Sequence, residues 1–251
     1  MQMEFTGERY VPELIAAKIS YEHWHRYIFA SRFCTGKKVL DIASGEGFGS
    51  DFLSRVASKV TGMDVAPDAV EHARLKYNSN IEFIVANATS IAADPESFDV
   101  VVSFETLEHL KKEDQDLFLQ EIARTIRKEG ILIISTPNKK VYSDTPNYSN
   151  PYHFSEFYRD EFELFLKKYF KNVSIFNQSV TGGSLICRTN ESVYDVEHIH
   201  LQPGGFVHGA IPAAVDAEYM IGVCSQVDFR NLYGSILLDD SNFLVNPAPS
   251  P

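Results

Sequence analysis

The chain has 251 residues and a formal net charge of −11, with 34 acidic and 23 basic residues. Its 44% of hydrophobic and 23% of charged residues are typical of a globular chain that forms one large domain. The lack of a long uncharged apolar run argues against a membrane-spanning helix, and the acidic balance argues against a nucleic-acid partner, because phosphate contacts need a basic surface.

The first predicted element is an amphipathic helix over residues 19–33, in the segment ISYEHWHRYIFASRF. Helical spacing places its large apolar side chains and one histidine on a single face: Tyr21, Trp24, His25, Ile28 and Phe29. A histidine among apolar neighbours is more often a packing residue than a catalytic one, and we interpret His25 in that way. Because a helix before the first strand can pack across the carboxyl edge of a sheet, residues 1–36 are predicted to form an N-terminal lid or helical arm.

The next hundred residues alternate between strand-like and helix-like runs. Apolar runs predict strands at 37–44, 59–65, 81–87, 98–104 and 131–136. The intervening runs predict helices at 51–57, 67–77 and 113–130. The last of these helices has acids in its first turn, bases in its last turn and Gly130 as its end. Alternation of this kind indicates an α/β fold with a mostly parallel sheet and helices on both faces.

The pattern changes after this alternating part. A stretch rich in Asn, Ser, Pro and Tyr, residues 138–156, predicts a long loop over the edge of the sheet. The later predicted elements are a helix at 159–170, a strand at 173–179 and a final strand at 217–226. Residues 182–216, with GG, PGG and HGA, are predicted to be an insertion or substrate lid within a domain that covers 37–246. Residues 247–251 are predicted to be a disordered tail.

A glycine-rich segment, VLDIASGEGFGS, follows the first predicted strand and precedes a helix. Small residues in this position let the backbone approach a ligand, and a helix N-terminus favours an anionic group. These features alone leave open a dinucleotide-binding loop or a tight turn without a ligand.

The segment resembles motif I of class I S-adenosylmethionine-dependent methyltransferases, in which the pattern is V-L-D-x-G-x-G-x-G. Asp41 and the glycines at 45, 47 and 49 match this pattern, whereas Ala43 stands in place of the first glycine. The resemblance covers about residues 37–178. It implies a Rossmann-like fold with a mostly parallel seven-stranded sheet, and S-adenosyl-L-methionine as the cofactor.

The same resemblance implies which residues contact the cofactor. The acid that ends the second strand, Asp64, would bond the ribose hydroxyls, and Asn87-Ala88 stand where the family has an acid–small pair near the adenine. Arg9 could meet the methionine carboxylate, or belong to a surface arm packed by neighbouring residues. The full predicted set is Arg9, Asp41, Ser44, Gly45, Gly47, Asp64, Val65, Asn87, Ala88 and Phe104.

A cluster of titratable residues follows the fourth predicted strand, in the segment SFETLEHL. On one helical turn, Glu105, Glu108 and His109 would share a face, since they are three and four residues apart. Two carboxylates that converge at the end of a sheet repel each other and lose hydration. We therefore expect a positive group among them.

Two enzyme families resemble this cluster and imply what the positive group is. The E-x-x-E-H pattern, STPN at 135–138 and HFSEFYRDEF at 153–162 are similar to small-RNA 2′-O-methyltransferases, which bind a divalent metal through two Glu and two His. Ubiquinone-biosynthesis O-methyltransferases share a related LEH motif. The first resemblance implies that Mg²⁺, Mn²⁺ or Fe²⁺ is bound by Glu105, Glu108, His109 and His153. Direct transfer would then use Glu105, His109 and His153 as catalytic residues. A simpler interpretation also stands, in which Glu108 and His109 only pack and Glu105 or His153 alone belongs to the site.

The N-terminal residues resemble a group of bacterial methyltransferases. FTGERYVPE at 5–13 and EHWHRY at 22–27 are similar to the start of methyltransferases found beside, or fused to, glycosyltransferases in surface-polysaccharide clusters. With the implied diol-binding metal site and the acidic surface, this predicts a sugar O-methyltransferase that acts on a glycan or an activated sugar, with a glycosyltransferase as a further partner.

Three other functions remain open at this point. They are a 3′-terminal ribose 2′-O-methyltransferase of RNA, which the acidic charge disfavours, a quinone or catechol O-methyltransferase, and a methyltransferase-like binding module without activity. The cysteines Cys34, Cys187 and Cys224 form no CxxC pair, and the first residues do not resemble a signal peptide. We therefore expect a cytoplasmic protein.

Overall fold

The computed structural model describes residues 17–77, 80–180, 184–188, 198–202, 205–209, 217–228, 232 and 234–237. Arg9, the FTGERYVPE segment, most of the predicted insertion and the predicted tail lie outside the described residues. The predictions for those parts of the chain are therefore not tested.

Five α-helices and two short helical turns are described. The helices are α1 (Ala17–Cys34), α2 (Phe48–Ser54), α3 (Pro67–Lys76), α4 (Lys112–Thr125) and α5 (Arg159–Lys167). The turns are η1 (Leu107–His109) and η2 (Lys140–Asp144), of which η2 lies within the predicted loop.

The strands of the first half are β1 (Lys38–Ile42), β2 (Lys59–Asp64), β3 (Ile81–Val85), β4 (Phe98–Phe104) and β5 (Ile126–Pro137). Those of the second half are β6 (Asn172–Val180), β7 (Ser184–Arg188), β8 (His198–Gln202), β9 (Gly205–Gly209), β10 (Tyr219–Ser225) and β11 (Ser235–Leu237). All strands predicted from the apolar runs are present. The predicted final strand, β10, is followed by the short β11.

The main sheet has the order β11-β7-β6-β10-β5-β4-β1-β2-β3. β1 to β5 pair in parallel, and β10 inserts antiparallel between β5 and β6. The seven strands from β6 to β3 form the predicted mostly parallel Rossmann-like sheet, and β7 and β11 extend it by two strands. Within the predicted insertion, β8 pairs with β9 in an antiparallel hairpin.

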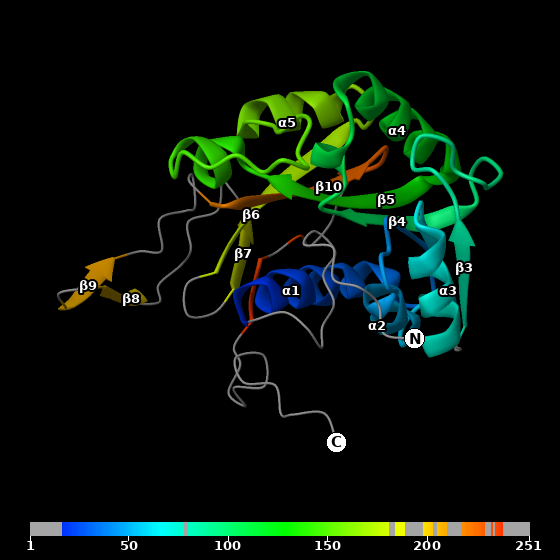
Figure 1. Ribbon diagram of the computed structural model, residues 1–251, viewed down its shortest axis with the longest axis horizontal. Coiled ribbons are helices and arrows are strands. Elements are labelled where there is room, and N and C mark those ends of the chain that lie inside the picture. The colour runs from blue at the N-terminus through cyan, green and yellow to red at the C-terminus, as the bar shows by residue number, and fades with distance from the viewer. Residues whose placement is uncertain are drawn as a thin grey trace.

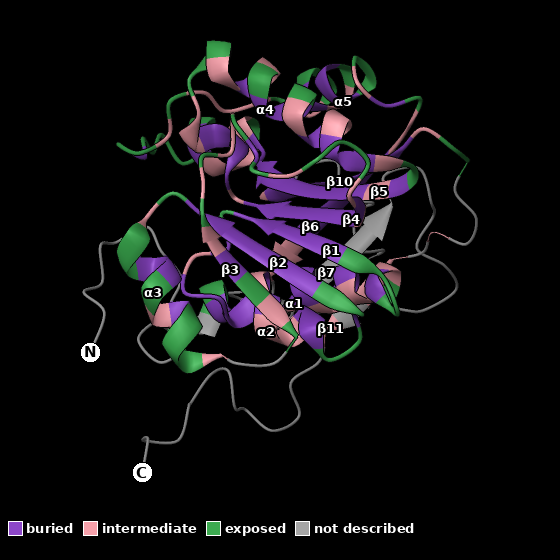
Figure 2. Ribbon diagram, turned by 90° about the vertical axis from the view of Figure 1, so that its right-hand side faces the viewer, coloured by how far each residue is buried: buried purple, intermediate pink, exposed green. Residues whose placement is uncertain are grey.

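Helices cover both faces of this sheet, with α1 and α2 on one face and α4 and α5 on the other (Figure 1). Alternate strand residues point to opposite faces. Val39, Val100 and Ile133 pack in the core beneath α1 and α2. Leu40, Val101 and Ile134 pack in the core beneath α4 and α5. The central strands are consequently buried along most of their length (Figure 2), as expected for a parallel sheet covered on both sides.

The helix predicted over 113–130 is shorter than expected, because α4 ends at Thr125 and residues from Ile126 onward form β5. Ile126 pairs with Phe98 of β4, and its side chain is buried in the core. Gly130 is therefore not a helix end. A Cβ there would lie 2.9 Å from the carbonyl oxygen of Asp99, so glycine allows the close approach of β4 and β5.

Candidate active site

A pocket of about 590 Å³ opens at the carboxyl ends of β1, β2 and β4. Ligands of open α/β sheets bind at this edge. The predicted site residues that line the pocket are Ser44, Gly45, Asp64, Val65, Phe104, Glu105, Glu108, His109 and His153. The rest of its lining comes from α1, from Ala43 and Phe48 of the glycine-rich segment, from the stretch after β5 and from Tyr219 of β10.

The glycine-rich loop forms one side of this pocket, and at Gly47 it packs tightly against the Phe83 ring. Gly45 and Gly47 have positive φ angles of 57° and 92°, and Ala43 adopts the same region with φ 59°. A Cβ at Gly47 would lie 2.8 Å from the Phe83 ring. Glycine is thus needed at 47 for packing, whereas Ala43 accepts the left-handed conformation that the family usually gives to a glycine.

Two aspartates hold this loop in place. Asp41 is buried and accepts hydrogen bonds from Ser50 Oγ at 2.7 Å and from the Tyr27 hydroxyl at 3.2 Å. Burial raises the pKa of Asp41 to about 7. Asp64 accepts a hydrogen bond from the backbone N–H of Gly45 at 2.8 Å and also lines the pocket. Asp64 thus lines the pocket, and its contact with the ribose stays a prediction, whereas Asp41 supports the loop from beneath.

Besides Asp41, three predicted cofactor residues do not line the pocket. Gly47 faces Phe83, Asn87 accepts hydrogen bonds from the backbone and hydroxyl of Thr89, and Ala88 packs against the main core. For these residues the structure gives a structural role, and their contacts with the cofactor stay predictions.

The positive group among the carboxylates is Arg26 of α1, which the sequence analysis did not identify. Its side chain is fully buried, with the guanidinium 4.3 Å above the Tyr219 ring. Nη1 lies 3.3 Å from Glu105 Oε1, and Nε donates to Gln178 Oε1 at 2.7 Å. Burial lowers the pKa of Arg26, but the carboxylates around it, Glu105 first, raise it overall. The signal in the sequence is an arginine one helical turn after Glu22.

Glu105 does not share a helical turn with Glu108, which corrects the arrangement expected from the sequence. Glu105 has a φ of 51° directly after β4, and the helical turn that follows covers only Leu107–His109. Its carboxylate accepts a hydrogen bond from Ser135 Oγ at 2.6 Å and pairs with Arg26. A non-glycine residue with positive φ is strained and is held in place by such contacts.

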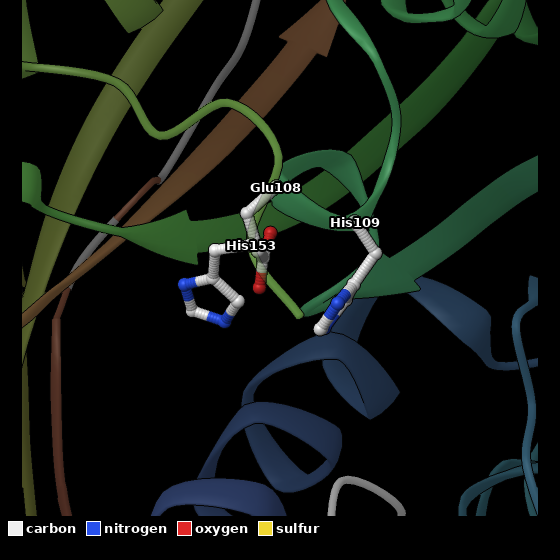
Figure 3. Close-up of side chains that lie close together, drawn as sticks. All are labelled: Glu108, His109 and His153. Carbon is white, nitrogen blue, oxygen red and sulfur yellow. The ribbon is translucent and has the colours of Figure 1, made fainter. Parts of the chain in front are cut away.

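Glu108, His109 and His153 come together in the pocket, with ligand atoms that all lie within 4.8 Å of one another. Figure 3 shows the Glu108 carboxylate between the two imidazole rings. Glu108 is fully buried; Oε2 accepts a hydrogen bond from Thr136 at 3.0 Å, and Oε1 has no hydrogen-bond partner among the described residues. Burial, with the negative charge of Glu105, raises the pKa of Glu108 well above its usual value. Glu105, the fourth predicted ligand, is not part of this group.

Hydrogen bonds determine which nitrogen of each histidine carries the proton. His109 Nδ1 lies 3.1 Å from the carbonyl oxygen of Tyr152, which can only accept, so Nδ1 donates and the lone pair is on Nε2. His153 Nδ1 donates to Glu156 Oε1 at 2.6 Å, and Nε2 accepts from Asn150 Nδ2 at 3.1 Å. A carboxylate behind an imidazole is a common support for metal-binding and catalytic histidines. Neither Glu156 nor Asn150 was predicted, although a glutamate three residues after a candidate histidine is a visible signal.

Comparisons with known proteins agree with this architecture. A family model described as a methyltransferase domain matches residues 40–134. Residues 40–134 thus match a methyltransferase domain, and the fold around them is the Rossmann-like fold of class I methyltransferases. A protein of Mycobacterium tuberculosis, named as a probable S-adenosylmethionine-dependent methyltransferase, is 38% identical over 165 residues, 63% of this chain and 58% of the relative. A ubiquinone biosynthesis O-methyltransferase of Pelagibacter ubique is 33% identical over 109 residues, 42% of this chain and 44% of the relative.

Solved structures show the same fold. The PH0226 protein from Pyrococcus horikoshii superposes with a TM-score of 0.59 at 17% identity, over 88% of this chain and 95% of that one. A 1,6-didemethyltoxoflavin-N1-methyltransferase from Burkholderia thailandensis superposes with a TM-score of 0.53 at 14% identity, over 84% of this chain and 80% of that one.

The methyltransferase domain model covers the glycine loop, Asp64 and the β4 cluster, but not α1, the loop after β5 or β10. The chain also spans less than two thirds of the length of the first of these relatives, at 58%. Arg26, His153 and Tyr219 therefore come from the parts that the domain model does not describe. No helix in the described part of the chain is long and apolar enough to cross a membrane.

Proposed function

We propose that this chain is an S-adenosylmethionine-dependent O-methyltransferase that methylates a hydroxyl of a neutral sugar, with a divalent metal held by Glu108, His109 and His153. The observation behind the metal is the buried Glu108, whose Oε1 has no hydrogen-bond partner among the described residues and lies beside two imidazoles. An unpaired buried carboxylate oxygen is costly, and a cation would stabilise it.

The donor set fits a first-row divalent metal. Two imidazoles and one carboxylate suit Fe²⁺ or Mn²⁺, whereas Mg²⁺ prefers oxygen ligands. When bound, such an ion would lower the pKa of an acceptor hydroxyl. His109 already has the tautomer with the lone pair on Nε2, whereas His153 would have to exchange its hydrogen bond from Asn150.

The chain's own residues support the remaining parts of the reaction. The glycine loop and Asp64 lie where the cofactor's methionine and ribose would bind, at the carboxyl edge of β1 and β2. The Nε2 lone pair of His153, whose Nδ1–H donates to Glu156, would serve as the metal ligand; without the metal, the same lone pair would instead accept the proton of the acceptor hydroxyl. Tyr142 stacks on His153 with ring centroids 5.3 Å apart and completes an aromatic side of the pocket suited to a sugar ring.

The charge of the pocket favours a neutral acceptor over an RNA end. Among the described residues, Glu22, Glu105 and Glu108 line it together with one guanidinium, that of Arg26. Phosphate groups would meet more carboxyl groups than guanidinium groups there, in a chain whose formal net charge is −11. A glycosyltransferase partner is proposed only on the resemblance of the N-terminal residues.

A quinone or catechol O-methyltransferase is the second candidate. It is favoured by the ubiquinone-biosynthesis relatives and by the aromatic residues of the pocket, which include Phe48, Tyr142 and Tyr148. An apolar acceptor would not, however, engage the buried polar groups of Arg26 and Glu108.

The test is transfer of labelled methyl from S-adenosylmethionine to two panels of acceptors, neutral glycosides and catechols, with and without Mn²⁺. The proposal expects metal-dependent labelling of at least one glycoside. Labelling of catechols alone, at a rate that chelation does not change, would replace it by the second candidate.

A further inference from the structure

The Arg26–Glu105 ion pair lies on the side of the pocket where the acceptor would bind, between α1, the end of β4 and the start of β10. We infer that Glu105 determines the charge of the acceptor: by neutralising Arg26, it prevents a buried guanidinium from binding anionic groups. This inference deepens the proposed function and rests on it for the identity of the acceptor as a sugar.

The guanidinium is placed as an anion-binding group would be. It lines the pocket, yet its side chain is only 1% exposed, and neither Nη1 nor Nη2 has a hydrogen-bond partner among the described residues. Its position is fixed by the stacking on Tyr219 and by the bond from Nε to Gln178. Arginine in such a setting is a strong ligand for carboxylate and phosphate oxygens, because its donors form a fixed fork.

Glu105 prevents Arg26 from binding anions by neutralising its charge. Its Oε1 is 3.3 Å from Nη1, an ion-pair distance that leaves the Nη1 donor without a hydrogen bond, and its strained backbone keeps the carboxylate there. Two more acids, Glu22 and Glu108, face the same space. With Glu105 charged, a phosphate or uronate approaching Arg26 meets no net positive charge, whereas a neutral hydroxyl can still accept from the Nη groups and donate to Glu108.

Replacing Glu105 by glutamine should therefore reverse the preference. A unit charge at about 5 Å, with an effective dielectric constant of about 20, changes the affinity for an anion by roughly 250-fold. After screening by water and salt, we expect a gain in anion affinity of at least about tenfold.

The probe is inorganic phosphate, titrated by ³¹P NMR into protein saturated with S-adenosylhomocysteine in the presence of EDTA. The product fills the cofactor subsite and EDTA removes metal, so that Arg26 is the cation under test. The matched control is Glu82→Gln, which removes one carboxylate from an exposed ion pair with Lys59 elsewhere on the sheet.

Glu105→Gln is expected to bind phosphate at least tenfold more tightly than the unchanged chain and than Glu82→Gln. The gain should vanish in the double variant Arg26→Met/Glu105→Gln, or in Arg26→Gln/Glu105→Gln if the methionine variant does not fold. Equal phosphate affinity in the unchanged chain and in Glu105→Gln would overturn the inference. A gain that persists in the double variants would do the same, since Arg26 would not be its cause.

An acceptor-labelling experiment distinguishes failure of the proposed sugar activity from failure of the inference about Glu105. Methyl β-D-glucopyranoside and its C6 uronate differ at one carbon and are offered as acceptors to the unchanged chain and to Glu105→Gln. Labelling of the neutral glycoside by the unchanged chain, with a shift toward the uronate in the variant, supports both proposals. If only catechols are labelled while the phosphate results are as expected, the sugar function is wrong and the exclusion of anions by Glu105 stands.

Discussion

Gly49 offers a sensitive test of how α1 and the glycine loop are packed. A Cβ at this position would lie 1.9 Å from Tyr27 Cζ and 2.3 Å from Cε1, so the substitution Gly49→Ala cannot be made without moving the ring. The tyrosine would have to shift by roughly 1.5 Å to reach ordinary contact, and overpacking of this kind costs about 1–3 kcal/mol. The shift would also break the hydrogen bond from Tyr27 to Asp41.

The sign of the effect makes this prediction informative. Gly49 lies in α2 with an ordinary helical backbone, where alanine would otherwise stabilise the helix by up to about 1 kcal/mol. Urea denaturation of Gly49→Ala should therefore show a loss of about 1–3 kcal/mol in the free energy of unfolding, with a fall in melting temperature of about 2–4 °C for each kcal/mol.

Two further variants separate the clash from other effects. Gly36 has a φ of 70° and no atom within 4 Å of its would-be Cβ, so Gly36→Ala measures backbone strain without a clash. Tyr27→Leu should relieve the clash, and the double variant Gly49→Ala/Tyr27→Leu should be more stable than the sum of the single changes predicts. An increase in stability for Gly49→Ala, or strict additivity with Tyr27→Leu, would refute the packing described here.

Three other predictions follow from the buried charges. Asp41 has a folded pKa of about 7, against an ordinary value of 3.8. Its contribution to stability is therefore present at low pH and is lost as the pH rises to 7. In urea denaturation, the free energy of unfolding of Asp41→Asn relative to the unchanged chain should thus increase between pH 5 and pH 8. Arg26→Met should lower the free energy of unfolding by about 3–5 kcal/mol, and adding Glu105→Gln should recover part of this loss. Purely additive effects of the two substitutions would contradict the buried ion pair. Glu156→Gln should reduce the affinity for Mn²⁺ about 10–100-fold, and unchanged binding of S-adenosylhomocysteine serves as the control. Unaltered metal affinity would show that Glu156 does not support His153 as a ligand.

The strands and the glycine loop could be predicted because their signals are local. The run FDVVVSF contains its own apolar pattern, and β4 covers those residues and no others. The end of α4 could not be predicted in this way. Ile126 has no local signal against helix strong enough to reveal that it pairs with Phe98 on another strand. The pairing of distant segments overrides the helical preference of residues 126–130.

The residues of the site could also be predicted only in part from the sequence. Glu108, His109 and His153 were predicted as neighbours through family resemblance, and the structure brings them together. Arg26 was missed because the residues that make its burial possible, such as Glu105 and Gln178, lie far away in the chain. A buried cation is defined by such partners, which spacing within one helix does not reveal.

The central claim is that Glu108, His109 and His153 bind a metal while Glu105 pairs with Arg26. Calorimetric titration of Mn²⁺ into protein saturated with S-adenosylhomocysteine tests it directly, in the unchanged chain and in the variants Glu108→Gln and Glu105→Gln. We expect binding in the unchanged chain, retention in Glu105→Gln and loss in Glu108→Gln. Absence of binding in the unchanged chain, or equal binding in Glu108→Gln, would contradict it.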